Sequence, residues 1–357
     1  MAPIDNPVLP PGSTILVTGV NGFIASVVAD VLLSHGYNAR GMVRDTAKHA
    51  WMASHFDQKH GAGRFELVHV ANISAPGAFD AAMQGVAGVA HVAAIMNHDP
   101  DPNNVVPPSL EAINSILESA AKTPSVKRFV LASTAKTVRS VDSKDPVVLT
   151  QASWNETSVE RAWKPPPYEP ERGLEVYGAA KVATEKVMWK FVEERKPAFV
   201  CNSVLPASTF GRLLSPEHQG TPSSTQFVAA LFKGDMQFLA HMTSLIKCCT
   251  WRPLNPPVFG YSDNDDVAYL HLAGLIHPDV QGERLWAYDK SCHWNDLLAV
   301  FRKNFPGRQF VDDVTGVFRD LAENQPAQRS NEILRNFGRP GLAEMEDIIV
   351  KWIPQFI

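Results

Sequence analysis

The feature that most constrains how this chain folds is a short apolar run that ends in a glycine-rich turn. Residues Thr14–Thr18 form the run, with Pro-Gly before it and Gly19 after it, as expected of a strand buried on both faces of a sheet. Apolar side chains then follow at helical spacing over Phe23–His35, Gly36 ends this helix, and Ala39–Arg44 predicts the next strand. We therefore expect a βαβ unit at the start of the chain.

The same alternation of strands and helices continues along the chain. Further strands are predicted at Glu66–Val70, Gly88–Ala94, Arg128–Ala132 and Phe199–Leu205, and helices at Gly77–Met83, Leu110–Ala121 and Tyr177–Arg195. Pro, Gly and Ser then interrupt the pattern, and the tail predicts a strand at Arg284–Tyr288 and helices at Trp294–Asn304 and Glu344–Trp352. This order predicts an α/β fold built on a doubly wound parallel sheet of the Rossmann type.

The change of pattern after residue 206 suggests how the chain is divided. We expect a dinucleotide-binding domain over residues 1–206, with a return segment at about 258–277, and a smaller, mostly C-terminal substrate-binding lobe made of 207–257 and 278–357. A substrate cleft is expected between the two parts.

Composition excludes several classes of partner. The 33 Lys and Arg residues are mixed with 37 Asp and Glu residues, so no basic stripe for nucleic acid is expected. The first residues lack the pattern of a signal peptide, and the apolar runs are shorter than the roughly 20 residues that span a bilayer. The 4 cysteines show no disulfide or metal spacing, and we expect reduced thiols in a cytoplasmic protein without a membrane partner.

The turn Gly19–Ala25 has the features of a dinucleotide site. A glycine allows the tight turn, a second lets the backbone approach a pyrophosphate, and the following helix offers free N–H groups and the positive end of its dipole. The turn residues expected to touch the cofactor are Gly19, Asn21, Gly22, Phe23 and Ile24.

The end of the second predicted strand indicates which cofactor binds. NAD enzymes place an acidic residue there, whereas this chain has Arg44, which suits the 2′-phosphate of NADP(H). Arg40 or Lys48 could add charge. Asp45 follows directly and keeps NAD open as the alternative.

Tyr177 and Lys181 form the candidate catalytic pair. Their spacing places both side chains on one face of a helix, and an ammonium one turn away is expected to lower the pKa of the phenol. The tyrosine would then be an acid suited to neutral pH.

Five segments together resemble the extended short-chain dehydrogenases/reductases. They are the turn Gly19–Ala25, Val89–Ala93, the stretch from Val126 to Thr134, the Tyr177–Lys181 pair and Leu205-Pro206. The resemblance covers nearly the whole chain, is strongest up to residue 206, and is closest to the branch of dihydroflavonol reductases and microbial carbonyl (aldehyde) reductases.

The resemblance implies a reaction and a set of site residues. It implies NADPH-dependent reduction of a small-molecule aldehyde or ketone by hydride transfer, with Tyr177 as proton donor, in a monomer or homodimer. It also implies that Ala93, Ala94 and Pro206 touch the cofactor. The catalytic hydroxyl falls on Ser133 or Thr134, and the register narrowly favours Thr134.

Three positions depart from the pattern of these relatives. Asn72 stands where an Asp commonly faces the adenine, and Leu110–Ala112 replaces a Gly-Gly-Thr near the cofactor or substrate. Lys136 is an unusual charge beside the hydroxyl pair, and a solvated lysine is favoured over a ligand for a substrate carboxylate.

Other functions stay open. A nucleotide-sugar epimerase or dehydratase is disfavoured because the segment Ala135–Arg139 lacks the residues that usually follow the hydroxyl in those enzymes. A cinnamoyl-CoA reductase is disfavoured because the Asn-Trp-Tyr signature is absent. An NAD-dependent 3β-hydroxysteroid dehydrogenase and a catalytically silent dinucleotide-binding protein remain alternatives. No metal site is expected, and His91 is interpreted as a core histidine. Core and pocket wall are expected to share the aromatic residues Trp154, Trp163, Phe210, Phe227, Trp251 and Trp286.

Overall fold

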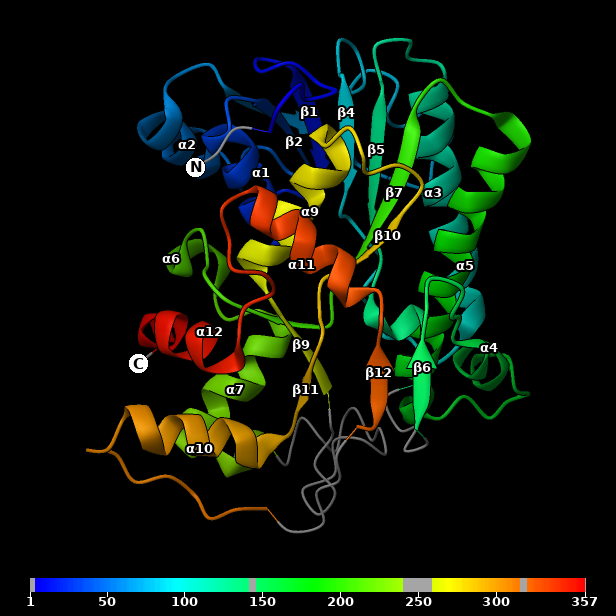
Figure 1. Ribbon diagram of the computed structural model, residues 1–357. Helices are drawn as coiled ribbons and strands as arrows, with labels where there is room; N and C mark the ends of the chain where they lie inside the picture. Colours follow the sequence, from blue (N-terminus) through cyan, green and yellow to red (C-terminus); the bar gives the residue numbers. More distant parts are fainter. Residues whose placement is uncertain (1–3, 141–145, 240–258, 315–319, 357) are drawn as a thin grey trace.

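A seven-stranded parallel sheet forms the centre of the computed structural model, which describes residues 4–140, 146–239, 259–314 and 320–356 (Figure 1). The strand order is β10-β7-β5-β4-β1-β2-β3. The strands are β1 (Thr14–Thr18), β2 (Asn38–Val43), β3 (Phe65–His69), β4 (Gly88–His91), β5 (Arg128–Ala132), β7 (Val200–Leu205) and β10 (Arg284–Trp286). The predicted doubly wound parallel sheet is confirmed.

Helices cover both faces of this sheet because each face is apolar. One face packs against α1 (Phe23–Ser34) and α9 (Asn264–Ile276), in a core that also takes residues from α11 (Ala327–Asn336). The other face packs against α3 (Val106–Ala121) and α5 (Gly173–Arg195). The remaining helices of this part are α2 (Trp51–His60), α4 (Glu156–Ala162), η1 (Pro102–Asn104), η2 (Ala135–Thr137) and η3 (Pro170–Arg172).

A smaller lobe lies below the sheet in Figure 1. Its three-stranded sheet has the order β11-β9-β8, and its helices share an apolar core with Phe210, Phe301 and Trp352. The elements are β8 (Ser208–Phe210), β9 (Phe259–Asp263), β11 (Ser291–Cys292), α6 (Pro216–Gln219), α7 (Ser223–Lys233), α10 (Trp294–Asn304), α12 (Met345–Trp352) and η4 (Ile353–Phe356). The lobe therefore has a core of its own.

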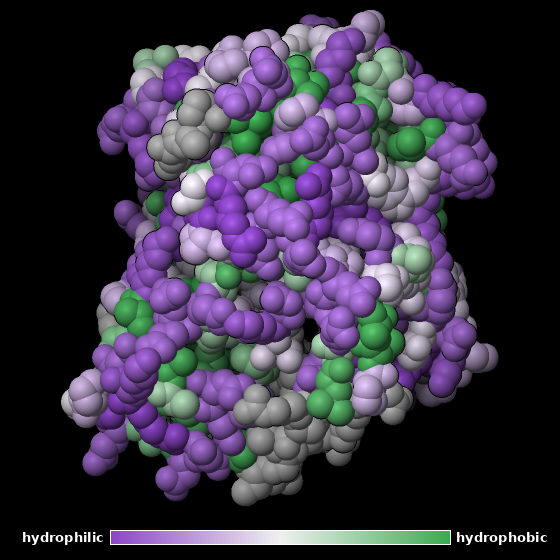
Figure 2. Space-filling view, viewed as in Figure 1, coloured by the Kyte–Doolittle hydropathy of each residue, from purple (hydrophilic) through white to green (hydrophobic). Residues whose placement is uncertain are grey.

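Two short parallel strands, β6 (Val147–Leu149) and β12 (Ala322–Asn324), connect loops beside the lobe. Val147, Val148 and Leu321 are exposed there. In Figure 2 this face of the molecule is mostly hydrophilic, with apolar patches in the region of β6 and β12 and a hollow next to them.

The structure corrects several predicted elements. Residues 77–83 form consecutive turns instead of a helix, because Gly77 has φ +71° and the backbone bonds there are those of turns, although Phe79 and Met83 are buried as their spacing suggested. Tyr177 lies inside α5, which begins at Gly173, and not at the start of a helix.

The division of the chain also differs in detail. β10 lies in the range 278–357 that was assigned to the lobe, yet it pairs with β7 in the large sheet. In the opposite sense, β9 lies in the return segment 258–277, yet it pairs with β8 and β11 of the lobe. The sheet that a single strand joins depends on its pairing partner in the folded protein, and the local sequence pattern does not predict that partner.

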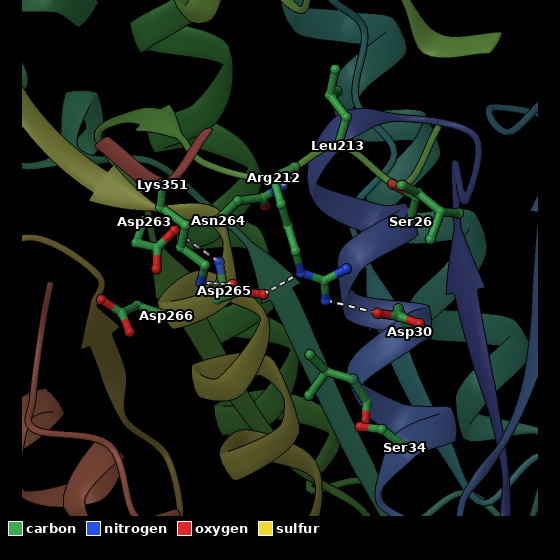
Figure 3. A network of polar contacts seen from close by, with 12 residues as sticks. Ser26, Asp30, Ser34, Arg212, Leu213, Asp263, Asn264, Asp265, Asp266 and Lys351 are labelled. Carbon is green, nitrogen blue, oxygen red and sulfur yellow. Dashed lines mark hydrogen bonds and ion pairs between the residues drawn. The ribbon is translucent and has the colours of Figure 1, made fainter. Parts of the chain in front are cut away.

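An ion-pair network with buried carboxylates connects the lobe to the helix that follows the glycine turn (Figure 3). Arg212, just after β8, contacts Asp30 of α1 at 2.8 Å and Asp265 of α9 at 2.6 Å. Lys351 of α12 contacts Asp265 at 3.1 Å, and Asn264 donates to the Phe23 carbonyl oxygen at 3.1 Å. Burial of the carboxylates makes these contacts stronger than exposed pairs.

Candidate active site

A large cleft of about 1770 Å³ runs along the carboxyl ends of the central strands and into the lobe. β1 and β4 are neighbours, and the strand order proceeds from β1 to one edge of the sheet and from β4 to the other edge. In doubly wound folds, ligands bind at the carboxyl ends of the strands where the order reverses in this way. The cleft is lined by every predicted site residue, namely Gly19, Asn21, Gly22, Phe23, Ile24, Arg44, Asn72, Ala93, Ala94, Ser133, Thr134, Tyr177, Lys181 and Pro206.

The glycine turn fits a closely approaching phosphate. Gly19 has φ +65°, and a Cβ at this position would lie 3.2 Å from Ala93, so both the backbone and the space require glycine. Gly22 is the N-cap of α1 and has no side chain to occupy the first free N–H groups of the helix. These groups stay available for an anion.

Thr18 holds the turn to the end of β4, a role that the sequence analysis missed. Its hydroxyl accepts hydrogen bonds from the N–H groups of Val92 and Ala93, both at 3.0 Å, and lies 3.0 Å from Nδ1 of His91. The hydroxyl hydrogen is thus directed to His91, whose pKa burial lowers to about 3. His91 is a neutral core histidine, as predicted.

The basic residues around the end of β2 have different surroundings. Arg44 is exposed and lines the cleft. Arg40 does not, because it pairs with Glu66 at 2.6 Å and donates to the carbonyl oxygens of Ala82 and Gln84, so the suggestion that it adds charge to the site is wrong. Neither Lys48 nor Asp45 is among the lining residues.

Tyr177, Lys181 and Thr134 meet in the middle of the cleft. Thr134 and Tyr177 both line the cleft, where the hydroxyl of Thr134 acts on the pKa of the Tyr177 phenol, and Lys181 Nζ donates to the carbonyl oxygen of Ala132 at 2.8 Å. The three side chains come from the end of β5 and from one face of α5. A phenol, a second hydroxyl and an ammonium therefore lie close together in the cleft.

The electrostatics of this group differ from the prediction. Burial raises the pKa of Tyr177, and the hydroxyl of Thr134 opposes that rise; the pKa is therefore raised and not lowered as predicted. Burial also lowers the pKa of Lys181 to about 8, against the opposing charge of Glu185. The tyrosine is consequently held in its protonated form, which is the form that donates a proton.

Ser133 belongs to a different network. It is buried, and its hydroxyl donates to Glu185 at 2.5 Å. Glu185 also accepts from Ser203 at 2.8 Å and from Arg284 at 2.8 Å, and the Arg284 guanidinium lies 4.0 Å from the centre of the Trp154 ring. This network ties β5, α5, β7 and β10 together behind the cleft.

Lys136 is not the solvated lysine that the sequence suggested. Only 5% of its side chain is exposed, and its ammonium pairs with Glu175 of α5 at 3.2 Å. No local sequence pattern predicts this pair, because the two residues lie far apart in the chain.

The cleft wall includes further residues that sequence reasoning did not assign. The His98 ring lies 5.7 Å from that of Tyr177, and Tyr288 lines the side next to β12. Of the aromatic residues considered above, Phe210 and Trp286 are buried, Phe227 lines the cleft, Trp163 is exposed, and Trp251 lies outside the described residues. Trp154 packs on Arg284, as described above.

The described part of the chain has neither a candidate metal site nor a candidate membrane-spanning helix. Its His, Cys, Asp and Glu residues form no group that could hold a metal ion. None of its helices combines the length and hydropathy needed to cross a bilayer.

Comparison with known proteins identifies relatives of this chain. The sequence pattern of a family described as "NAD dependent epimerase/dehydratase family" matches residues 15–235. The chain belongs to this family. It is an enzyme of the extended short-chain dehydrogenase/reductase type, and the resemblance noted from the sequence is confirmed.

Individual members of the family are similar over nearly the whole chain. "NAD-dependent epimerase/dehydratase terH" of Aspergillus terreus is 36% identical over 98% of this chain and 98% of its own. "Aldehyde reductase 2" of Sporidiobolus salmonicolor is 38% identical over 98% and 97%. The solved structure of yeast methylglyoxal/isovaleraldehyde reductase Gre2 complexed with NADPH has a TM-score of 0.75 at 23% identity and covers 96% and 98%; at this identity it shows the shared fold.

Proposed function

We propose that this enzyme reduces a small-molecule aldehyde or ketone to an alcohol with NADPH, with Tyr177 as proton donor. The observation that carries the proposal is the convergence of Tyr177, Thr134 and Lys181 in the cleft that begins at the glycine turn. The relative named an aldehyde reductase supports the same reaction class.

The residues present fit a dinucleotide. The close approach of Gly19 to Ala93 and the uncapped first turn of α1 suit a pyrophosphate, and Lys181 and Pro206 line the cleft farther along. When bound, NADPH supplies the two electrons and the hydrogen that reduce the carbonyl carbon. Arg44 would hold the 2′-phosphate.

Asp45 offers little support for the alternative cofactor NAD. Its carboxylate accepts from the backbone N–H of Lys48 at 2.9 Å, within its own loop. The 2′-hydroxyl of an NAD ribose would therefore compete with a local turn for this group. The exposed guanidinium of Arg44 is the better placed of the two.

The proton chemistry follows from the pKa directions. Tyr177 keeps its proton because its environment disfavours the phenolate, and it releases the proton only when negative charge develops on the carbonyl oxygen. The hydroxyl of Thr134 can donate to the same oxygen and hold it beside Tyr177. The Lys181 ammonium offsets the charge that proton transfer leaves on the tyrosine.

Replacement of Tyr177 by Phe tests the proposal. The variant removes one hydroxyl, and we expect kcat for NADPH-dependent reduction of a panel of aryl ketones, ketoesters and aldehydes to fall by about 10²–10⁴-fold, with NADPH binding preserved. Tyr168→Phe is the matched control, since Tyr168 lies in a loop beside Arg172 and does not line the cleft. Near wild-type turnover by Tyr177→Phe would refute the mechanism.

A further inference from the structure

The ion pair between Lys136 and Glu175 joins the two segments that carry the catalytic hydroxyl groups, and Lys136 itself lines the cleft beside Thr134. Lys136 follows Thr134 by two residues in the turn η2, and Glu175 precedes Tyr177 by two residues in α5. The pair at 3.2 Å is therefore a cross-link between the two segments that bring the hydroxyls of Thr134 and Tyr177 into the cleft.

Both members of the pair are shielded from water. The exposed fractions of the Lys136 and Glu175 side chains are 5% and 13%. Glu175 also accepts from the hydroxyl of Ser158 and lies 3.5 Å from Arg161. A pair in such surroundings depends on its geometry, because each charge would be costly to leave without its partner.

Backbone hydrogen bonds of the turn couple Lys136 to Thr134. Asn155 Nδ2 donates to the Lys136 carbonyl oxygen at 2.8 Å, and the Lys136 N–H donates to Thr134 Oγ1 at 3.3 Å. A displacement of Lys136 would thus be passed to the hydroxyl of Thr134 through the backbone of the same turn.

The helix side leaves little free space. Gly178, next to Tyr177, is so close that a Cβ there would lie 3.1 Å from both Cγ and Cε of Lys136. The methylene chain of Lys136 lies over the helix backbone at this point, and the ammonium reaches Glu175 beyond it. Packing and charge act on the same two segments.

We propose that the Lys136–Glu175 pair is a positioning device that holds the Thr134 hydroxyl against Tyr177. The inference rests on the proposed function, because it assigns the pair an effect on the proton donor of that reaction. Neither residue is assigned a contact with the reacting atoms. Their effect on turnover would pass through Thr134.

The double variant Lys136→Met/Glu175→Gln tests this inference. It removes both charges, so no buried charge is left unpaired, and we expect a melting temperature near that of the wild type. We expect kcat to fall by about 10-fold or more, because small misplacements of catalytic groups cost up to about 10²-fold, while the KM for NADPH stays unchanged. Lys190→Met is the control, since it removes an exposed pair with Glu194 on the same helix.

A double-mutant cycle with Thr134→Val separates positioning from a general structural effect. If the pair acts through Thr134, its removal in the Thr134→Val background causes little further loss of kcat. Additive losses, or a double variant with wild-type kcat, would overturn the inference. Should the double variant fail to fold, Gly178→Ala displaces Lys136 with both charges kept and enters the same cycle.

The result can be distinguished from failure of the proposed function. If Tyr177→Phe keeps its activity, the function itself is wrong. If Tyr177→Phe is inactive and the pair variants are additive with Thr134→Val, only the positioning role is wrong.

Discussion

The two adjacent hydroxyls at the end of β5 should respond in opposite ways to removal. Ser133 donates to Glu185 at 2.5 Å in a fully buried network, whereas Thr134 is partly exposed and lines the cleft together with Tyr177. We expect Ser133→Ala to reduce stability with a small effect on kcat, and Thr134→Val to reduce kcat with a small effect on stability.

The magnitudes follow from the partners. A hydrogen bond to a charged group contributes about 1.5–3 kcal/mol. Glu185 retains Ser203 and Arg284 after the substitution, so we expect about 2 kcal/mol for Ser133→Ala, or a few degrees of melting temperature. Loss of an orienting donor at a developing oxyanion costs about 10²–10³-fold in kcat, which is the range expected for Thr134→Val.

The assay compares the two purified variants with the wild type. Steady-state reduction gives kcat and KM, and thermal unfolding followed by circular dichroism gives the melting temperature. The reasoning is refuted if Ser133→Ala abolishes turnover while Thr134→Val remains active, since the catalytic hydroxyl would then belong to Ser133.

Three further outcomes are expected. Arg44→Ala should raise the KM for NADPH much more than the KM for NADH, whereas Lys48→Ala, outside the cleft, should change neither; equal effects of Arg44→Ala on both cofactors would contradict contact with a 2′-phosphate. Carbonyl reduction should decline as the pH rises through about 8, where Lys181 loses its proton in the free enzyme, and a kcat/KM profile flat from pH 7 to 9 would contradict this. The pKa of Asp263 is raised to about 7 by burial and by the charges of Asp266 and Asp265, so the folded state loses stability as the pH rises from about 4 to 7. Asp263→Asn keeps the N-cap of α9 and should make the melting temperature less sensitive to pH over that range. An unchanged sensitivity would contradict this assignment.

Local patterns predicted most of the central architecture. The strand Arg128–Ala132 and the helix Trp294–Asn304 have the bounds expected from the sequence, since each is a strongly patterned run with clear ends. The glycine turn was equally recognisable, because glycines at this spacing between a buried strand and a helix are typical of a backbone that a phosphate can approach closely. The helix predicted at 77–83 was wrong, because buried residues at helical spacing also occur in consecutive turns.

The site was only partly predictable, for a physical reason. Residue types near the motifs were found, but the partner that fixes each charge lies elsewhere in the chain. Arg40 is held by Glu66 and Lys136 by Glu175, and neither pairing leaves a local signal. The pKa of Tyr177 similarly depends on burial, which spacing along a helix does not reveal.

The Arg212 network has a consequence for recombining this enzyme with its relatives. Asp30 lies on the helix that follows the glycine turn and Asp265 on α9, while Arg212 comes from the connection that enters the lobe. A hybrid that took its lobe from a relative without an arginine at this position would lose the cation that joins the two carboxylates, and Asp30 would keep only Lys59 and His60 as partners. In a hybrid enzyme, Arg212, Asp30 and Asp265 should therefore all come from the same parent.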